Sequence, residues 1–376
     1  MIEILIAGYH GFGNSGDEAI LLAMKNNISK INTPDGIALT ALAHKPAETA
    51  KAYGINAVQR YSFFSVLRAI SRADVILIGG GSVLQDSTST RSLMYYLSLI
   101  LMSLLFRKKT MLYANGIGPL SKRFNRRLTK FVVNHIDVIT LREQSSYDDL
   151  MSVGVSAPKT HVTADPAFSL TGISKEKAND ILSSCGIPSD KPIVGISLRE
   201  WKEYDNFYDA IAGLCDYLCG ERGCTVVFVP MQYPADLSIG KEILGRMNAS
   251  GAYILDKRCE PEEILGIFGL FDIVVAMRLH SLIYSALQHV PAVGIIYDPK
   301  VKYFLKLLQM PSAGDINSTK LDAGGLCEIV NDLIANREKY SKQLAKKSDD
   351  LIKKSRRNEI YLQELIASDR RSRKKT

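Results

Sequence analysis

The residues with the clearest chemical potential form a short stretch, Arg278-Leu279-His280, which directly follows an apolar run that ends at Met277. An apolar helix is expected immediately afterwards, at 282–287. The arginine and the histidine therefore stand at the carboxyl end of a predicted strand, where open α/β sheets bind their ligands. They also stand beside a helix N-terminus, whose free N–H groups and dipole favour anions. The pattern predicts an anion-binding and acid–base centre.

Three further cations follow predicted strands in the same way, namely Arg142, Arg199 and Lys300. The last two, together with the arginine and histidine above, would form a cradle for a small, highly charged anion. A guanidinium suits this task because it grips carboxylate or phosphate through two hydrogen bonds. A lone arginine or histidine more often has a structural role, but the recurrence of cations at strand ends favours binding.

A glycine-rich loop at residues 8–18 joins the first predicted strand to the first predicted helix. Its Gly11-x-Gly13-x-x-Gly16 spacing raises dinucleotide binding as one interpretation. However, the glycines begin several residues after the strand ends, and the second strand ends in Ala43-His44-Lys45, without an acidic residue to bind a ribose. A loop that packs against a ligand at the helix N-terminus is therefore favoured, with Asn14 and Asp17 as polar contacts. The alternative for Asp17 is a helix cap.

Two more loops of this kind follow later strands of the first half. One contains Gly80, Gly81, Gln85 and Asp86, and the other begins at Asn115. Glycines let a backbone approach a ligand or another loop closely. Three such loops at one edge of a sheet indicate a broad binding face for a bulky ligand.

Strand and helix patterns alternate in both halves of the chain, which predicts two parallel sheets covered by helices on both faces. A single hydrophobic core rarely extends over a chain of 376 residues. We therefore expect an α/β protein with two Rossmann-like domains facing a cleft. The first domain is expected at 1–170, a linker at 171–191, the second domain at 192–335, and a basic tail, helical and then disordered, at 336–376.

The net charge of the chain is +8. Residues 337–376 hold 14 Lys/Arg against 6 Asp/Glu, so the rest of the chain is neutral overall. The six cysteines show neither paired metal-ligand spacing nor the density of a disulfide framework. We therefore expect free thiols and no metal site. Because no signal peptide is visible, a cytoplasmic protein is expected.

An apolar segment at 93–106, followed by Arg107-Lys108-Lys109, raises the question whether the protein enters a membrane. The segment is too short to span about 30 Å of hydrocarbon, which takes roughly 20 helical residues. A buried helix is favoured, and a helix that dips into a membrane surface is the alternative.

Several of these segments occur together, and in the same order, in one protein family. They are Gly11-Phe12-Gly13-Asn14-Ser15-Gly16-Asp17-Glu18, Gly79-Gly80-Gly81 with Gln85-Asp86, Asn115-Gly116-Ile117-Gly118-Pro119, Leu141-Arg142-Glu143, Ala164-Asp165-Pro166-Ala167 and Met277-Arg278-Leu279-His280-Ser281. On these residues the chain resembles the polysaccharide pyruvyl transferase family, and within it the CsaB-type cell-wall enzymes. The basic C-terminal extension departs from the family pattern.

The resemblance implies a fold like that of GT-B glycosyltransferases. It implies phosphoenolpyruvate as the donor and, for CsaB-type enzymes, an N-acetylmannosamine residue of a lipid-linked cell-wall oligosaccharide as the acceptor. The product would be a cyclic 4,6-ketal of pyruvate, which S-layer homology domains recognise. Nothing in the sequence demands a metal or a cofactor.

The same resemblance assigns roles to the residues above. His280 would be the general acid that protonates the methylene carbon or, alternatively, the group that stabilises the departing phosphate. The donor would be held by Arg142, Arg199, Arg278, Leu279, His280 and Lys300. The acceptor side would comprise Asn14, Asp17, Gly80, Gly81, Gln85, Asp86, Asn115 and Asp165. Of these, Asp17 or Asp165 would accept a proton from the acceptor hydroxyl.

A basic tail would suit a lipid-linked acceptor, because each Lys/Arg near an anionic leaflet contributes about 1 kcal/mol. Peripheral contact with the inner face of the cell membrane is thus one expectation, and a solvated helix with a frayed end is the alternative. Two other functions stay open. A GT-B glycosyltransferase that uses a nucleotide sugar is the enzymatic rival, since fold does not fix function. A nucleic-acid-binding protein acting through the tail is the other, and the neutral body speaks against it.

Overall fold

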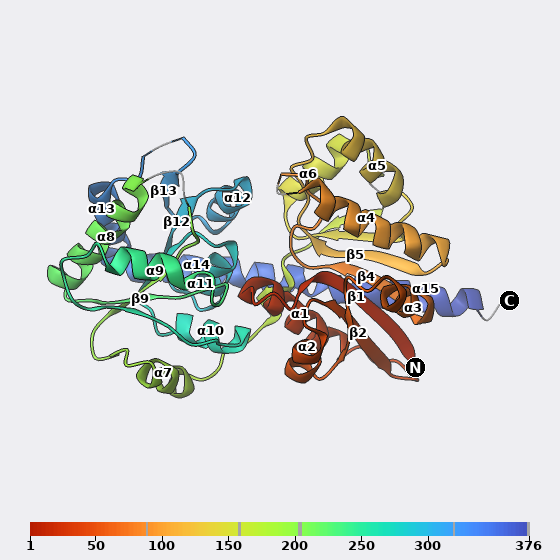
Figure 1. Ribbon diagram of the computed structural model, residues 1–376, viewed down its shortest axis with the longest axis horizontal. Coiled ribbons are helices and arrows are strands. Elements are labelled where there is room, and N and C mark those ends of the chain that lie inside the picture. Colours follow the sequence, from red (N-terminus) through yellow and green to blue (C-terminus); the bar gives the residue numbers. More distant parts are fainter. Residues whose placement is uncertain (88, 157–158, 202–204, 319, 374–376) are drawn as a thin grey trace. The chain divides into compact units, whose positions relative to one another are not determined.

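The computed structural model describes residues 1–87, 89–156, 159–201, 205–318 and 320–373 (Figure 1). The chain forms two compact units. Unit 1 contains Met1–Leu170 and also Leu351–Thr376, and unit 2 contains Thr171–Asp350. Each unit has a parallel β-sheet and a hydrophobic core of its own. The predicted α/β class with two Rossmann-like sheets is confirmed.

The sheet of unit 1 has seven parallel strands in the order β3-β2-β1-β4-β5-β6-β7. They are β1 (Ile2–His10), β2 (Ile37–Ala43), β3 (Asn56–Gln59), β4 (Val75–Gly79), β5 (Lys109–Asn115), β6 (Val138–Leu141) and β7 (Thr160–Val162). The strand order reverses between β1 and β4, which pair directly. The carboxyl ends of these two strands flank the switch point at which such sheets bind ligands.

Helices cover both faces of this sheet. They are α1 (Ser15–Ile28), α2 (Pro46–Tyr53), α3 (Phe63–Arg72), α4 (Thr90–Leu105), α5 (Arg123–Val133), α6 (Gln144–Val153), the 3₁₀ helix η2 (Pro166–Ser169) and α15 (Arg357–Arg373). Right-handed crossovers place α3 to α6 on one face, where Ile70, Leu97 and Val132 join the core, and α1 and α2 on the other. The helix predicted at 93–106 is observed as α4, which buries one side in the core and leaves Leu105 and Phe106 exposed at its end. Among the described residues, no helix has the length and hydropathy of a membrane span.

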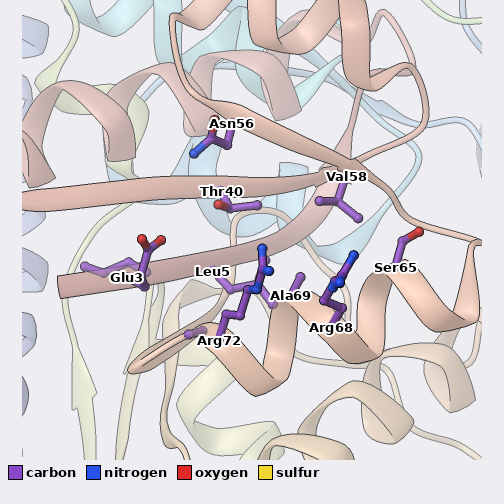
Figure 2. Close-up of a pocket in the computed structure, with 11 residues that line it drawn as sticks. Glu3, Leu5, Thr40, Asn56, Val58, Ser65, Arg68, Ala69 and Arg72 are labelled. Carbon is purple, nitrogen blue, oxygen red and sulfur yellow. The ribbon is translucent and has the colours of Figure 1, made fainter. Parts of the chain in front are cut away.

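Beside α3, the strands β1, β2 and β3 border a cavity of about 480 Å³ (Figure 2). Arg68 and Arg72 extend from α3 toward these strands, and Glu3, Thr40 and Asn56 line the cavity from the strands themselves. Glu3 and Asn56 lie at the amino ends of β1 and β3. The cavity is therefore separate from the carboxyl edge, which holds the predicted site residues.

Unit 2 has six parallel strands in the order β10-β9-β8-β11-β12-β13. They are β8 (Ile193–Ser197), β9 (Thr225–Phe228), β10 (Ala252–Ile254), β11 (Ile273–Ala276), β12 (Ala292–Ile296) and β13 (Ser312–Asp315). Its helices are α7 (Lys175–Ser184), α8 (Asp205–Gly220), α9 (Leu237–Leu244), α10 (Pro261–Phe268), α11 (Leu279–Leu287), α12 (Pro299–Leu308), α13 (Ala323–Ala335) and most of α14 (Arg337–Ser355), whose residues after Asp350 belong to unit 1. The order reverses between β8 and β11, which gives this sheet a switch point too.

The segments predicted to be a linker and a tail both contain helices that pack on one of the two units. The linker expected at 171–191 contains α7, which packs on α10, and a Cβ on Gly172 would lie 2.7 Å from the backbone N of Gly266. The tail expected at 336–376 contains α15, which packs on β5 and β6 of unit 1. Asn358 of α15 accepts a hydrogen bond from the Thr163 hydroxyl at 2.8 Å. The expectation of a separate tail is wrong for α15, because these contacts make it part of unit 1.

Candidate functional site

The cations of unit 2 stand at one edge of its sheet. Arg199 follows β8, Arg278 follows β11 and Lys300 follows β12. Strand β11 pairs with β8 on one side and with β12 on the other, both in parallel. The three residues therefore come after the carboxyl ends of three adjacent strands, although the sequence alone did not show that these strands are neighbours.

Arg278 is held in place by a carboxylate. It is the N-cap residue of α11, and its Nη2 donates to Oδ1 of Asp236, the N-cap residue of α9. Asp236 also accepts the backbone N–H of Gln232 at 2.9 Å. The side chains of Asp236 and Arg278 are only 4% and 15% exposed, so the ion pair is shielded from solvent. It fixes the guanidinium, whose Nε is buried and has no hydrogen-bond partner in the described part of the chain.

His280 is the second residue of α11 and is partly exposed, as is Leu279. The start of this helix is anchored on the sheet, because the hydroxyl oxygens of Ser281 and Ser197, at the end of β8, lie 2.6 Å apart. The N–H groups of the first helical turn lack intrahelical acceptors and carry partial positive charge. An imidazole at this position can exchange a proton with an anion that these groups bind.

Arg199 is held by an aromatic ring instead of a carboxylate. Its guanidinium carbon lies 4.9 Å from the centroid of the Tyr297 ring, which makes a cation–π contact. The Tyr297 ring packs edge-on against Trp201, with the ring centroids 5.9 Å apart. The Nε of Arg199 is buried, again with no partner among the described residues. Stacking on a ring leaves the in-plane N–H donors of a guanidinium available to a ligand.

Lys300 lies in the first turn of α12, where Asp298 caps the helix by accepting the Lys300 N–H at 2.8 Å. Its side chain is partly exposed. Helices α11 and α12 both begin at the edge that carries the cations, because they follow the adjacent strands β11 and β12. Two helix N-termini and three side-chain cations thus converge on one edge, which is suited to a multiply charged anion.

Arg142 belongs to unit 1 and is buried. It donates to Glu143 at 2.8 Å, to Asp165 at 3.0 Å and to Ser82 at 3.1 Å. Burial acts to lower the pKa of Arg142, but the two carboxylates outweigh it and raise this pKa. Asp165 is fully buried and also accepts the N–H of Ala167 at 3.0 Å. The predicted roles need correction here: Arg142 and Asp165 tie loops of unit 1 together, and Asp165 presents no surface to an acceptor hydroxyl.

The first glycine-rich loop is fixed by a residue whose role the sequence did not show. Glu18 accepts the N–H of Gly11 at 2.7 Å and the hydroxyl of Tyr53 at 2.9 Å. Gly11 has a φ of +79°, which side-chain-bearing residues rarely adopt. Asn14 is the N-cap residue of α1 and accepts the N–H of Gly16 at 3.0 Å. The loop therefore owes its shape to internal contacts.

The second glycine-rich loop passes close to α1. A Cβ on Gly80 would lie 2.3 Å from Cγ2 of Ile20, and one on Gly81 would lie 2.8 Å from Oδ1 of Asp17. The two glycines thus let the loop after β4 approach Asp17, which is partly exposed at the switch point of this sheet. Further along the loop, Gln85 accepts a hydrogen bond from a neighbouring serine hydroxyl at 2.6 Å. Asp17 therefore stays a predicted ligand contact.

Asp86 and Asn115 support the loops that follow β4 and β5. Asp86 accepts the backbone N–H groups of Ser121 at 2.9 Å and Lys122 at 3.0 Å. Burial acts to raise its pKa, but these hydrogen bonds outweigh that effect and lower the pKa of Asp86 to about 2. Asn115 is fully buried and donates to the carbonyl of Ile78 at 2.5 Å. Both predicted acceptor-side residues are therefore buried and hold the loops.

An arginine that the sequence analysis missed occupies the carboxyl edge of the unit 1 sheet. Arg60, directly after β3, is buried and donates through Nη1 to the carbonyl of Gly8 at 2.7 Å. The rings with centroids 4.8–5.8 Å from its guanidinium carbon are Tyr9, Phe12, Tyr61, Tyr95 and Tyr96. No single segment signals this cluster, because its members come from distant parts of the chain.

Two details of this cluster bear on its rigidity. Tyr9 stacks on Phe12, and Phe12 on His44, with centroid distances of 4.0 and 4.5 Å. His10, at the end of β1, is buried, and its burial together with the charge of Arg60 lowers its pKa to about 3. His10 is therefore neutral at physiological pH.

A model of the polysaccharide pyruvyl transferase family matches residues 14–299 of this chain. The chain belongs to the polysaccharide pyruvyl transferase family. Membership assigns it pyruvyl transfer in polysaccharide synthesis, with a sugar or a polysaccharide as the acceptor. The matched range includes Asp17, Arg199 and the Arg278–His280 stretch, and it ends directly before Lys300.

This pyruvyl transferase is similar to proteins that share 12–24% of its sequence. The amylovoran biosynthesis protein AmsJ of Erwinia amylovora is 24% identical over 294 residues, which cover 74% of this chain and 69% of AmsJ. HepE of Anabaena, solved in complex with UDP and glucose, is 14% identical with a TM-score of 0.64, over 98% of this chain and 100% of that one. The UDP-GlcNAc 2-epimerase of Neisseria meningitidis, bound to UDP-GlcNAc, is 12% identical with a TM-score of 0.67, over 98% and 100%. These two structures confirm the predicted GT-B-like fold.

Proposed function

We propose that this protein transfers the pyruvyl group of phosphoenolpyruvate to two hydroxyls of a sugar as a cyclic ketal, with release of phosphate. One observation carries the proposal. Arg199, Arg278 and Lys300 follow three adjacent strands at an edge where two helices begin. Phosphoenolpyruvate bears a carboxylate and a phosphate on the same carbon, so holding it requires several cations close together.

The reaction can be balanced with the groups at this edge. His280 donates a proton to the methylene carbon, which becomes a methyl group, and the substituted carbon gains positive charge. A sugar hydroxyl adds to that carbon, the bond to the phosphate oxygen breaks, and the second hydroxyl closes the ketal ring. One hydroxyl proton restores His280 and the other leaves with the phosphate.

The restraints on the two arginines suit this chemistry. The Asp236 carboxylate holds Arg278, and the Tyr297 ring holds Arg199, so neither guanidinium has to reorganise as the charge on the phosphate develops. We assign phosphate and carboxylate binding to these two arginines and to Lys300. Of the two carboxylates predicted to accept a hydroxyl proton, only Asp17 stays a candidate, because Asp165 is fully buried.

For the acceptor we propose an N-acetylmannosamine residue of a lipid-linked cell-wall precursor, converted to its 4,6-ketal as in CsaB-type enzymes. The support for this choice is the resemblance of the glycine-rich loops and the Arg278–His280 stretch to that group. Such a product would serve in S-layer anchoring, and the reaction would take place at the inner face of the cell membrane.

The test uses Trp201, the single tryptophan of the chain, which lies in unit 2 next to Tyr297. Phosphoenolpyruvate should quench its fluorescence, and UDP-sugars should not. Phosphate should be released only when a lipid-linked acceptor with two free hydroxyls is added. Binding of a UDP-sugar without binding of phosphoenolpyruvate would replace the proposal with nucleotide-sugar transfer.

A variant separates the two possible roles of His280. In His280→Ala, phosphate release should fall by at least about 100-fold, the usual contribution of a general acid. Quenching of Trp201 by phosphoenolpyruvate should persist with a similar Kd. If the Kd rises as steeply as turnover falls, His280 binds the phosphate instead of delivering the proton.

A further inference from the structure

The charged residues of unit 1 are unevenly distributed along the chain, and one range is rich in basic residues. Residues 60–136 hold 12 Lys/Arg and only two carboxylates, Asp74 and Asp86. Both carboxylates accept backbone N–H groups, from Glu3 at 2.9 Å and from Ser121 at 2.9 Å. Helices α3, α4 and α5, which lie in this range, contain no acidic residue. Of the twelve cations, Arg60 is buried and Lys109 pairs with Asp137 at 2.9 Å. The three helices themselves carry seven Lys/Arg, so the neutral total of the body conceals a basic layer.

Large apolar side chains are exposed on the same layer. On α5, Phe124 is 69% and Phe131 61% exposed; at the start of α3, Phe64 is 82% exposed; at the end of α4, Leu105 is 80% exposed. Helix α4 packs against both α3 and α5, so the three helices form one layer over the sheet (Figure 1). Side chains of this size are usually buried, so the exposure of four of them on the three helices of one layer points to an interaction surface.

Helix α5 shows how the two residue types are combined. Phe124 and Phe131 are seven positions apart, so they lie on one side of the helix with Arg127 between them. Arg123, Arg127 and Lys130 are exposed as well, and none has an ion-pair partner within the described ranges. Exposed aromatic rings interleaved with unpaired cations are typical of helices that lie in a bilayer interface.

We propose that the outer surface of α3, α4 and α5 docks unit 1 on a bilayer that contains anionic lipid. The cations match the charge of such a leaflet, where each adds about fivefold to affinity. The phenylalanine rings enter the boundary between headgroups and acyl chains. A nucleic acid fits less well, because a duplex backbone offers phosphates to the cations but no apolar phase to Leu105 and the phenylalanines. The proposal rests on this surface alone and not on the identity of the donor.

The test is co-sedimentation of the full chain with vesicles of phosphatidylcholine, alone or mixed with phosphatidylglycerol. Two variants probe the surface, F124S/F131S for its apolar part and R127E/K130E for its charge. Two matched controls change exposed residues elsewhere, I360S on α15 and K175E/K177E on α7. All of these positions are exposed, so the fold should survive, and circular dichroism checks this.

The full chain should bind the mixed vesicles much more tightly than phosphatidylcholine alone. Each surface variant should weaken this binding by at least about tenfold, and the controls should leave it unchanged. Absence of binding by the full chain, or equal binding by the surface variants, would overturn the proposal. A third result would also overturn it. If the full chain binds random duplex DNA, R127E/K130E abolishes that binding, and F124S/F131S still binds vesicles normally, the surface is a nucleic-acid site.

Discussion

Replacing Arg278 by alanine should reveal two separable effects, one on stability and one on catalysis. The guanidinium neutralises Asp236, whose side chain is only 4% exposed. It also stands at the edge where we place the donor. The R278A change therefore leaves a buried carboxylate without its counter-ion, and it removes an anion-binding group as well. A second substitution, Asp236→Asn, allows the two effects to be measured apart.

The size of the stability effect follows from burial. Breaking a buried ion pair by removing one partner costs about 3–5 kcal/mol. Arg278 is itself 15% exposed, so water can reach the pair in part and we expect a value near the lower limit, about 3 kcal/mol. In R278A/D236N no unpaired charge remains, and an asparagine can still accept the N–H of Gln232. The double variant should therefore regain about 2 kcal/mol of that loss.

Chemical denaturation followed by the fluorescence of Trp201 reports on unit 2, because this tryptophan belongs to that unit. Phosphate release should be lost in R278A and should stay lost in the double variant. If the loss in free energy of unfolding in the double variant equals the sum of the losses in R278A and D236N, the two residues do not couple and the electrostatic reasoning is wrong. If it recovers turnover, Arg278 serves only to neutralise Asp236 and does not bind the donor.

Two further predictions concern unit 1. The pKa of His10 is lowered to about 3 by burial, so between that pH and about 6.5 the unfolded chain binds a proton that the folded chain does not. Unit 1 should consequently lose about 1.4 kcal/mol of stability for each pH unit below 6.5. Hydrogen exchange of the β1 amides measures this stability, and its dependence on pH should be weaker in His10→Gln. An equal dependence on pH in the variant and in the unchanged chain would contradict the prediction. Ending the chain after Ser355 removes α15 and its contact with Thr163. This truncation should lower the melting temperature of unit 1 in calorimetry, while the unfolding transition of unit 2, followed by Trp201 fluorescence, should not change. An unchanged melting temperature of unit 1 would show that α15 is dispensable.

Most of the strands could be predicted from the sequence, because a parallel strand that is buried on both faces consists of an uninterrupted run of apolar residues. Residues 75–79 and 273–276 are such runs, and both are buried over their whole length. The cations that follow strand ends were found for the same reason, since the residue after a buried strand is where polarity returns. Their convergence depends on the strand order, which local patterns do not contain.

The contacts that the sequence did not predict join residues that are distant along the chain. Asp236 pairs with Arg278 across 42 positions, and Asp165 pairs with Arg142 across 23. Each partner looked like an ordinary surface residue or a free functional group until the packing of loops brought the two together. The charge distribution was misread for a related reason. A total over 1–336 cancels the basic layer against acidic residues elsewhere.

The fold alone does not decide between a nucleotide sugar and phosphoenolpyruvate, because both present a phosphate that a helix N-terminus can bind. The side chains at the edge of the unit 2 sheet are more discriminating. A carboxylate and a phosphate on one carbon place their negative charges within a few ångströms, which calls for several rigid cations. Arg278 is locked by an ion pair and Arg199 by an aromatic ring, and each keeps a buried Nε–H without a partner among the described residues. These restrained guanidinium groups are the reason why we propose a small dianion, and the binding comparison of phosphoenolpyruvate with UDP-sugars tests that choice.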